Sequence, residues 1–103
     1  DSRYRTWFVE QQRRINRLLV FPRERALMMD QGTSVYRIHL ARSGAMPRPP
    51  ELLRSSGFSD FDRAALRAIQ RNLPFAPLPA DLAPELSSVV IRMPVEFTNP
   101  MVH

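Results

Sequence analysis

Few side chains in this sequence have the types and spacing that catalysis or metal binding requires. The histidines, His39 and His103, lie far apart in the chain and show no metal-ligand spacing. Asp60 and Asp62 stand at the start of a predicted helix, where capping and the helix dipole favour carboxylates over paired acid and base roles. Cysteine is absent, which excludes thiolate chemistry. We therefore predict no catalytic residue, no metal site, no cofactor and no enzymatic activity.

Two further groups invite a chemical interpretation. Ser55, Ser56 and Gly57 stand together, but they match neither a nucleophile elbow nor a phosphate-binding loop, so we interpret them as a turn. The stripe Arg63, Arg67 and Arg71 has the spacing of one helix face, and all 15 basic residues are arginine in a chain of net charge +5. Phosphate contacts are an open alternative for this stripe, although no nucleic-acid motif accompanies it.

The strongest binding signal lies near the end of the chain, where Ser88 to Phe97 alternates apolar and polar residues with the period of a strand. Pro94 interrupts this strand and has no N–H to donate to a neighbour. Prolines inside strands are tolerated where the N–H side faces an unpaired edge. We therefore predict that this strand forms an open sheet edge. Backbone groups alternate direction along a strand, so the even-numbered residues point outward with Pro94: Val90, Arg92, Pro94 and Glu96.

The elements that must position this strand follow from the apolar periodicity. Tyr4 to Val20 is amphipathic and ends before Pro22, and a second helix, with Phe61 on its core face, runs from about Asp60 to Leu73. Ser59 and Asp62 have the spacing of a capping box for that helix.

Strands are predicted at Thr33 to Arg42, where Ile38 is a core position, and weakly at Glu51 to Arg54 in a proline-rich segment. Residues 73–86 hold four prolines and are predicted to be an extended loop. The order indicates an α+β two-layer domain, with two helices packed on one face of a three-stranded antiparallel sheet.

The 103 residues have the usual length of one small domain, and their 44% hydrophobic content is that of a globular chain. We therefore expect residues 1–103 to form a single domain. No segment has the length of a membrane span or the pattern of a signal peptide.

Several of these pieces, in their order and spacing, resemble the TonB C-terminal domain family. They are an aromatic-proline pair, a glycine-led strand with a glycine turn, a Ser-Ser-Gly turn, an LD-x-A-A-L-like helix start, a proline loop and a closing strand: Phe21-Pro22, Gly32 to Gly44, Ser55 to Gly57, Phe61 to Leu66, Pro74 to Pro79 and Val90 to Phe97. The resemblance covers about residues 15–99. Phe21 replaces the family's usual tyrosine, and prolines crowd the second strand.

The resemblance implies a periplasmic domain of a TonB-type energy transducer, whether TonB itself or a paralogue such as HasB. Such a protein is attached to the inner membrane by an N-terminal anchor and a proline-rich linker, both absent from this sequence. It is driven by ExbB and ExbD, and it captures the TonB box of outer-membrane receptors that import siderophores, haem or similar ligands. The isolated domain is expected to be a monomer or a weak dimer.

Under this resemblance the peptide-binding residues are Val90, Arg92, Pro94 and Glu96, and the receptor peptide adds as one more strand. Leu18 falls where some members carry a glutamine near the receptor peptide, and Leu18, Phe21 and Pro22 are expected as secondary contacts. Two other classes stay open, a periplasmic interaction module such as a TolA-like C-terminal domain and a small basic nucleic-acid-binding domain.

Overall fold

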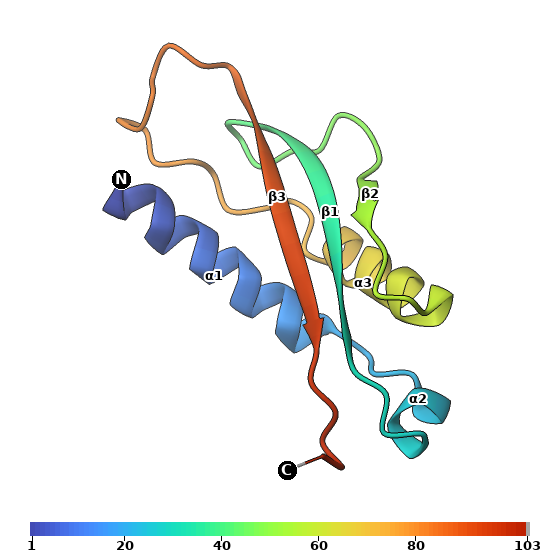
Figure 1. The fold of residues 1–103 in the computed structure, drawn as a ribbon. Coiled ribbons are helices and arrows are strands. Elements are labelled where there is room, and N and C mark those ends of the chain that lie inside the picture. Colours follow the sequence, from blue (N-terminus) through green and yellow to red (C-terminus); the bar gives the residue numbers. More distant parts are fainter. Residues whose placement is uncertain (103) are drawn as a thin grey trace.

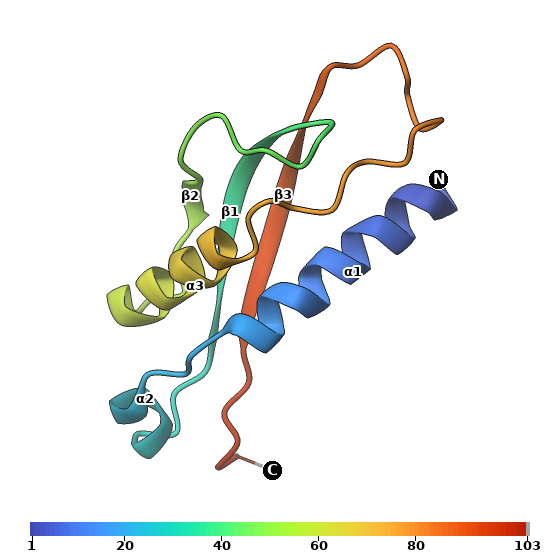
Figure 2. The same cartoon turned by 180° about the vertical axis from the view of Figure 1, so that it is seen from behind.

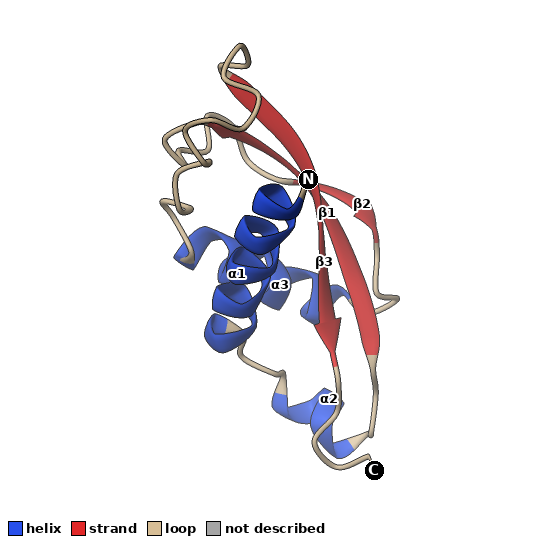
Figure 3. Ribbon diagram, turned by 90° about the vertical axis from the view of Figure 1, so that its left-hand side faces the viewer, coloured by secondary structure: helices blue, strands red, loops and turns tan. Residues whose placement is uncertain are grey.

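The structure is a computed structural model that describes residues 1–102. Within this range the elements follow one another as α1 (Ser2–Leu18), α2 (Arg23–Leu27), β1 (Gly32–Ala41), β2 (Glu51–Arg54), α3 (Ser59–Arg71) and β3 (Ser88–Phe97). Figure 1 shows the strands side by side, and from behind both long helices lie over the same face of the sheet. The side view in Figure 3 separates the helical layer from the strand layer. The predicted α+β two-layer fold is confirmed.

The three strands form one antiparallel sheet in the order β2-β1-β3. β1 pairs with β3 along its whole length, from Gly32 opposite Phe97 to Ala41 opposite Ser88. The pairing of β1 with β2 is short and contains an irregularity between Val35 and Tyr36. Within residues 1–102, β3 is therefore a long strand with one paired side and one edge without a neighbouring strand.

The core lies between the sheet and the helices because each strand turns alternate side chains toward them. Tyr36, Ile38 and Leu40 of β1 are buried, as are the odd-numbered residues of β3 from Ile91 to Phe97. Phe61 of α3 is fully buried and stacks on Phe97, with ring centroids 4.2 Å apart. Small side chains on the same face of α3, Ala64, Ala65 and Ala68, let the helix approach the sheet closely.

Tight backbone packing requires a glycine in the turn after β1. Gly44 has φ +92°, in the left-handed region, and a Cβ there would lie 1.9 Å from the Phe75 carbonyl oxygen. The Phe75 N–H donates to the Gly44 carbonyl at 3.0 Å, which joins this turn to the proline-rich loop. Phe75 itself is buried in the core.

A single arginine organises the rest of that loop. The Arg42 guanidinium donates to four loop carbonyls at 2.8–3.0 Å, those of Pro79, Leu82, Ala83 and Leu86. These carbonyls have no partner in a strand ladder, and the Arg42 guanidinium supplies the donors that they need. The segment before β3 thereby has a defined path without regular secondary structure.

The predicted capping box at the start of α3 is wrong. The N-cap residue is Phe58, which makes no side-chain cap hydrogen bond, and Ser59 is the first residue of the helix. The Asp62 carboxylate instead turns inward and accepts hydrogen bonds from the Ser34 hydroxyl at 2.7 Å and from the Ser56 N–H at 2.9 Å. A buried partner on a neighbouring strand, which local spacing does not reveal, outweighs the local cap.

Asp62 joins the Ser-Ser-Gly turn to the sheet and is ionised in the folded state. Burial alone raises the pKa of Asp62, but hydrogen bonds from Ser55, the Ser56 amide and Ser34 outweigh burial and hold this pKa below its ordinary value of 3.8. A depressed folded-state pKa means that the group stabilises the fold at pH values above its ordinary pKa. That contribution is lost as pH falls through the lower folded-state pKa.

We expect Asp62→Asn to lower the free energy of unfolding at pH 7 by about 2 kcal/mol, because a buried hydrogen-bonded carboxylate is replaced by an amide that cannot accept all its bonds. Urea unfolding at pH 7 and again near pH 3 measures this loss, which should shrink at the lower pH. The control Asp81→Asn, at an exposed loop carboxylate, should change stability by less than about 0.5 kcal/mol. An equal loss for Asp62→Asn at both pH values would contradict the role given to its charge.

Candidate functional site

β3 is an edge strand of ten residues, and its outer side is open. Its even-numbered side chains lie on the sheet face away from the long helices. Val90 is 57% exposed, Arg92 and Glu96 are exposed, and Pro94 is half-buried. The strand therefore presents both a backbone edge and a solvent-facing row of side chains.

One hydrogen bond reveals which way the backbone groups of β3 point. The Arg42 N–H donates to the Ser87 carbonyl at 3.3 Å, one step beyond the opposite pair Ala41 and Ser88. Because backbone groups alternate sides along a strand, the odd-numbered residues after Ser87 direct their N–H and C=O groups toward β1. The same alternation directs the even-numbered backbone, including that of Pro94, toward the free edge.

The C-terminal half of α1 approaches this edge (Figures 1 and 2). A pocket of about 320 Å³ lies there, lined from α1 by Gln12 and Asn16 and from the sheet by Thr33, Pro94 and Glu96. All of these side chains carry polar groups except the proline ring. The two α1 amides are not among the site residues predicted from the sequence.

The predicted secondary contacts lie elsewhere in the packing. Phe21 packs edge-on against Phe61 at 5.2 Å and against Phe97 at 5.8 Å, between ring centroids, and so extends the aromatic core. Leu18, at the end of α1, is half-buried against the same core, and Pro22 immediately precedes α2. The contacts of Leu18 and Phe21 are packing contacts, and Phe21 reaches β3 through Phe97.

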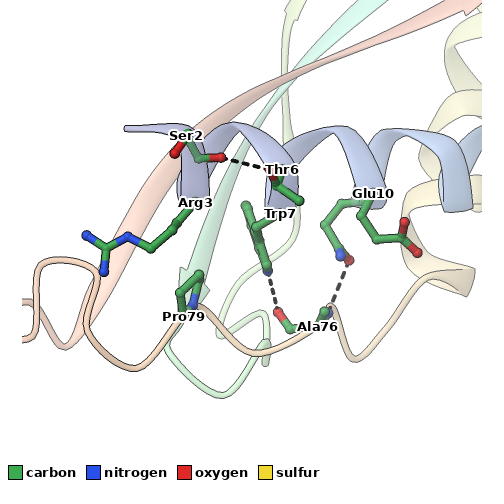
Figure 4. A pocket seen from close by; sticks show the side chains of 8 residues that line it. Ser2, Arg3, Thr6, Trp7, Glu10, Ala76 and Pro79 are labelled. Atoms are coloured by element: carbon green, nitrogen blue, oxygen red, sulfur yellow. Dashed lines mark hydrogen bonds between the residues drawn. The ribbon is translucent and has the colours of Figure 1, made fainter.

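A second pocket, about 440 Å³, lies between the first half of α1 and the proline-rich loop (Figure 4). The Trp7 indole N–H donates to the Ala76 carbonyl at 2.8 Å. The Ala76 N–H in turn donates to the Gln11 carboxamide oxygen at 3.1 Å, and Gln11 is fully buried. These two bonds attach the loop to the helix, which gives the residues around this pocket a structural role.

The side chains considered for chemistry have partners in the fold. His39 is half-buried, with Nδ1 3.2 Å from an Arg48 nitrogen and Nε2 3.4 Å from a Glu51 oxygen. Asp60 binds the Arg25 guanidinium at 2.9 Å. Across residues 1–102 no group of three potential metal ligands comes together, and His103 lies outside the described residues. Over the same range, no helix is long and apolar enough to cross a membrane.

The arginine stripe of α3 is exposed. Arg63, Arg67 and Arg71 all lie on the solvent side of the helix. Arg71 also lines a pocket of about 310 Å³ together with Arg14 and Arg17 of α1. This basic surface lies on the helical layer, on the opposite side of the core from the exposed row of β3.

Comparison with known proteins identifies the architecture. The family model of the Gram-negative bacterial TonB protein C-terminal region matches residues 17–98. A solution structure of the Helicobacter pylori TonB C-terminal domain superposes with a TM-score of 0.74 at 16% identity, covering 91% of this chain and 95% of that one. A longer form of the same domain gives 0.68 at 16% identity, covering 88% and 79%. No curated protein matches the chain significantly.

Proposed function

The chain belongs to the Gram-negative bacterial TonB protein C-terminal family, and from this membership we propose that it is the receptor-binding domain of a TonB-type energy transducer. It works in the periplasm, attached through an N-terminal segment outside this sequence to the inner membrane, where ExbB and ExbD drive it. Its partner is the TonB box of outer-membrane receptors that import siderophores, haem or similar ligands.

The observation that carries this proposal is the open edge of β3. An extended peptide that lies along this edge can pair with the outward backbone groups of Val90, Arg92 and Glu96 and with the carbonyl of Pro94. Main-chain pairing supplies most of the affinity, while the exposed side chains of the even-numbered row contact alternate peptide residues. Recognition by backbone suits a domain that serves several receptors with different box sequences.

Strand pairing also suits the transmission of force. When a paired strand is pulled along its length, the hydrogen bonds between the strands carry the load together. β3 is itself paired with β1 along ten residues, so a pull on the peptide passes directly into the centre of the sheet. The domain then acts by holding and pulling the peptide, and no covalent bond is made or broken.

Charge contributes to encounter more than to the final affinity. The net charge of +5 and the exposed arginines favour approach of peptides that contain an acidic residue, and salt screens this attraction. The same open edge allows two domains to pair weakly, so we propose a monomer that forms dimers only at high concentration.

The test is a direct peptide-binding measurement on the isolated chain. Fluorescence anisotropy with labelled synthetic TonB-box peptides should show weak, saturable binding that persists at high salt. A peptide of the same length with proline at alternate positions, which cannot complete the strand pairing, should bind less well. Tighter binding of duplex DNA than of every box peptide would overturn the proposal in favour of a basic nucleic-acid-binding domain.

A further inference from the structure

Pro94 creates a specific deficit in any peptide that adds to β3. Along a strand pair, each outward-facing residue normally donates its N–H to a carbonyl of the neighbouring chain. Pro94 has no N–H, so one carbonyl of the added peptide faces the proline ring without a donor. This deficit arises whether the peptide runs parallel or antiparallel to β3, and an unsatisfied carbonyl at a closed interface weakens binding.

The structure places two side-chain amides beside this gap. Gln12 and Asn16 are four residues apart and so lie on one face of α1. They line the same pocket of about 320 Å³ as Pro94, together with Thr33 and Glu96. A primary amide offers two N–H donors and an acceptor, which is the chemistry that a peptide main chain needs at a position without a backbone partner.

Within residues 1–102, the side-chain amides of Gln12 and Asn16 make no hydrogen bond to the rest of the fold. The side chains of α1 that form hydrogen bonds within residues 1–102 are those of Arg3, Thr6, Trp7, Gln11 and Arg14. Neither Gln12 nor Asn16 is among them. Gln12 is half-buried and Asn16 exposed, so the pair lies at the border between the helical layer and solvent.

We propose that Gln12 and Asn16 form the second wall of the peptide groove and donate a hydrogen bond to the peptide carbonyl that faces Pro94. This inference rests on the proposed function, because it assigns two specificity residues to the same site. The occupant is the main chain of an extended peptide, held on one side by β3 and on the other by α1. At this end of the edge two elements contact the peptide, and this fixes the register in which the peptide docks.

A double-mutant cycle tests the assignment. Gln12→Ala with Asn16→Ala is combined with Pro94→Val, which restores an N–H to β3. In the wild-type background the two alanines should weaken binding of a synthetic TonB-box peptide about three- to tenfold, the effect of one net hydrogen bond. In the Pro94→Val background the same substitutions should change affinity less than twofold, because the strand then supplies the donor.

Two further variants keep the test sharp. Gln70→Ala removes the same exposed amide from α3, away from the groove, and should leave affinity unchanged. Gln12→Met with Asn16→Leu keeps a similar side-chain volume and removes the donors without adding charge, and should reproduce the loss if the alanine variant does not fold. Unfolding curves measured in parallel show whether each variant is folded.

The outcomes separate this inference from the proposed function. An unchanged affinity in the wild-type background, or an equal loss in both backgrounds, overturns the donor role of the amides while peptide binding itself stands. Absence of peptide binding to the wild-type chain overturns both. A loss confined to the Pro94 background supports the assignment.

Discussion

Phe61→Ala is expected to lower the free energy of unfolding by about 3–5 kcal/mol, because the truncated side chain leaves a cavity at the centre of the core. Phe61 is fully buried and contacts three other aromatic rings. It stacks on Phe97 and meets Phe21 and Phe58 edge-on at 5.2–5.3 Å between ring centroids. These rings connect α3, β3 and the segment after α1, so the loss is felt across the fold.

Urea unfolding followed by circular dichroism measures this change. Leu52→Ala on β2 is the matched control, since Leu52 is 45% exposed and should cost less than about 1 kcal/mol. If the Phe61 and Leu52 variants unfolded at the same urea concentration, the aromatic cluster would not be the centre of the core.

Two proline substitutions at neighbouring positions of β3 should lower the stability of the fold by very different amounts. Ile91 is buried and opposite Ile38 of β1, and its backbone is directed toward β1. Ile91→Pro should therefore remove a ladder hydrogen bond and a core side chain, at roughly 3 kcal/mol or more. Arg92→Pro removes only an outward N–H from the free edge, so the expected loss of stability is below about 1 kcal/mol.

Peptide binding gives the expected effect of the outward substitution. Arg92→Pro should stay folded and bind a TonB-box peptide about two- to tenfold less tightly, because one main-chain hydrogen bond to the peptide is lost. Thermal melts and peptide titrations of both variants are the measurements. A comparable loss of stability at positions 91 and 92 would contradict the assignment of inward and outward backbone.

Local periodicity was sufficient to predict most of the fold. The alternation of β3 separates buried Ile91 and Met93 from exposed Val90 and Arg92, because one face of the strand contacts the helices and the other contacts solvent. The limits of β2 were predicted from proline positions alone, since the prolines before Glu51 cannot donate to a ladder. Structural features that depend only on residues close together in the sequence can therefore be predicted from the local pattern.

Features that depend on distant partners were not predictable in this way. Asp62 has the spacing of a cap, yet it accepts a hydrogen bond from Ser34, 28 residues earlier in the chain. Gln11 of α1 is fully buried, although glutamine is usually a surface residue. Its carboxamide oxygen accepts hydrogen bonds from Ala76 and Asn72, which lie more than 60 residues later in the chain.

The same reason explains the missed part of the candidate site. Gln12 and Asn16 have ordinary surface types on an amphipathic helix. Only the path of α1 past the end of β3 brings them beside Pro94. The strand half of the groove is therefore visible in the sequence, while the helical half requires the tertiary structure.

Amide hydrogen exchange of β3, with and without a TonB-box peptide, tests the central claim most directly. In the free domain the amides of Ile91, Met93 and Val95 should exchange slowly, since they pair with β1, while those of Val90 and Arg92 should exchange fast. Adding the peptide should slow exchange at the outward amides and leave the inward ones unchanged. Outward amides that stay fast while the peptide is bound would contradict the β3 edge as the receptor-binding site.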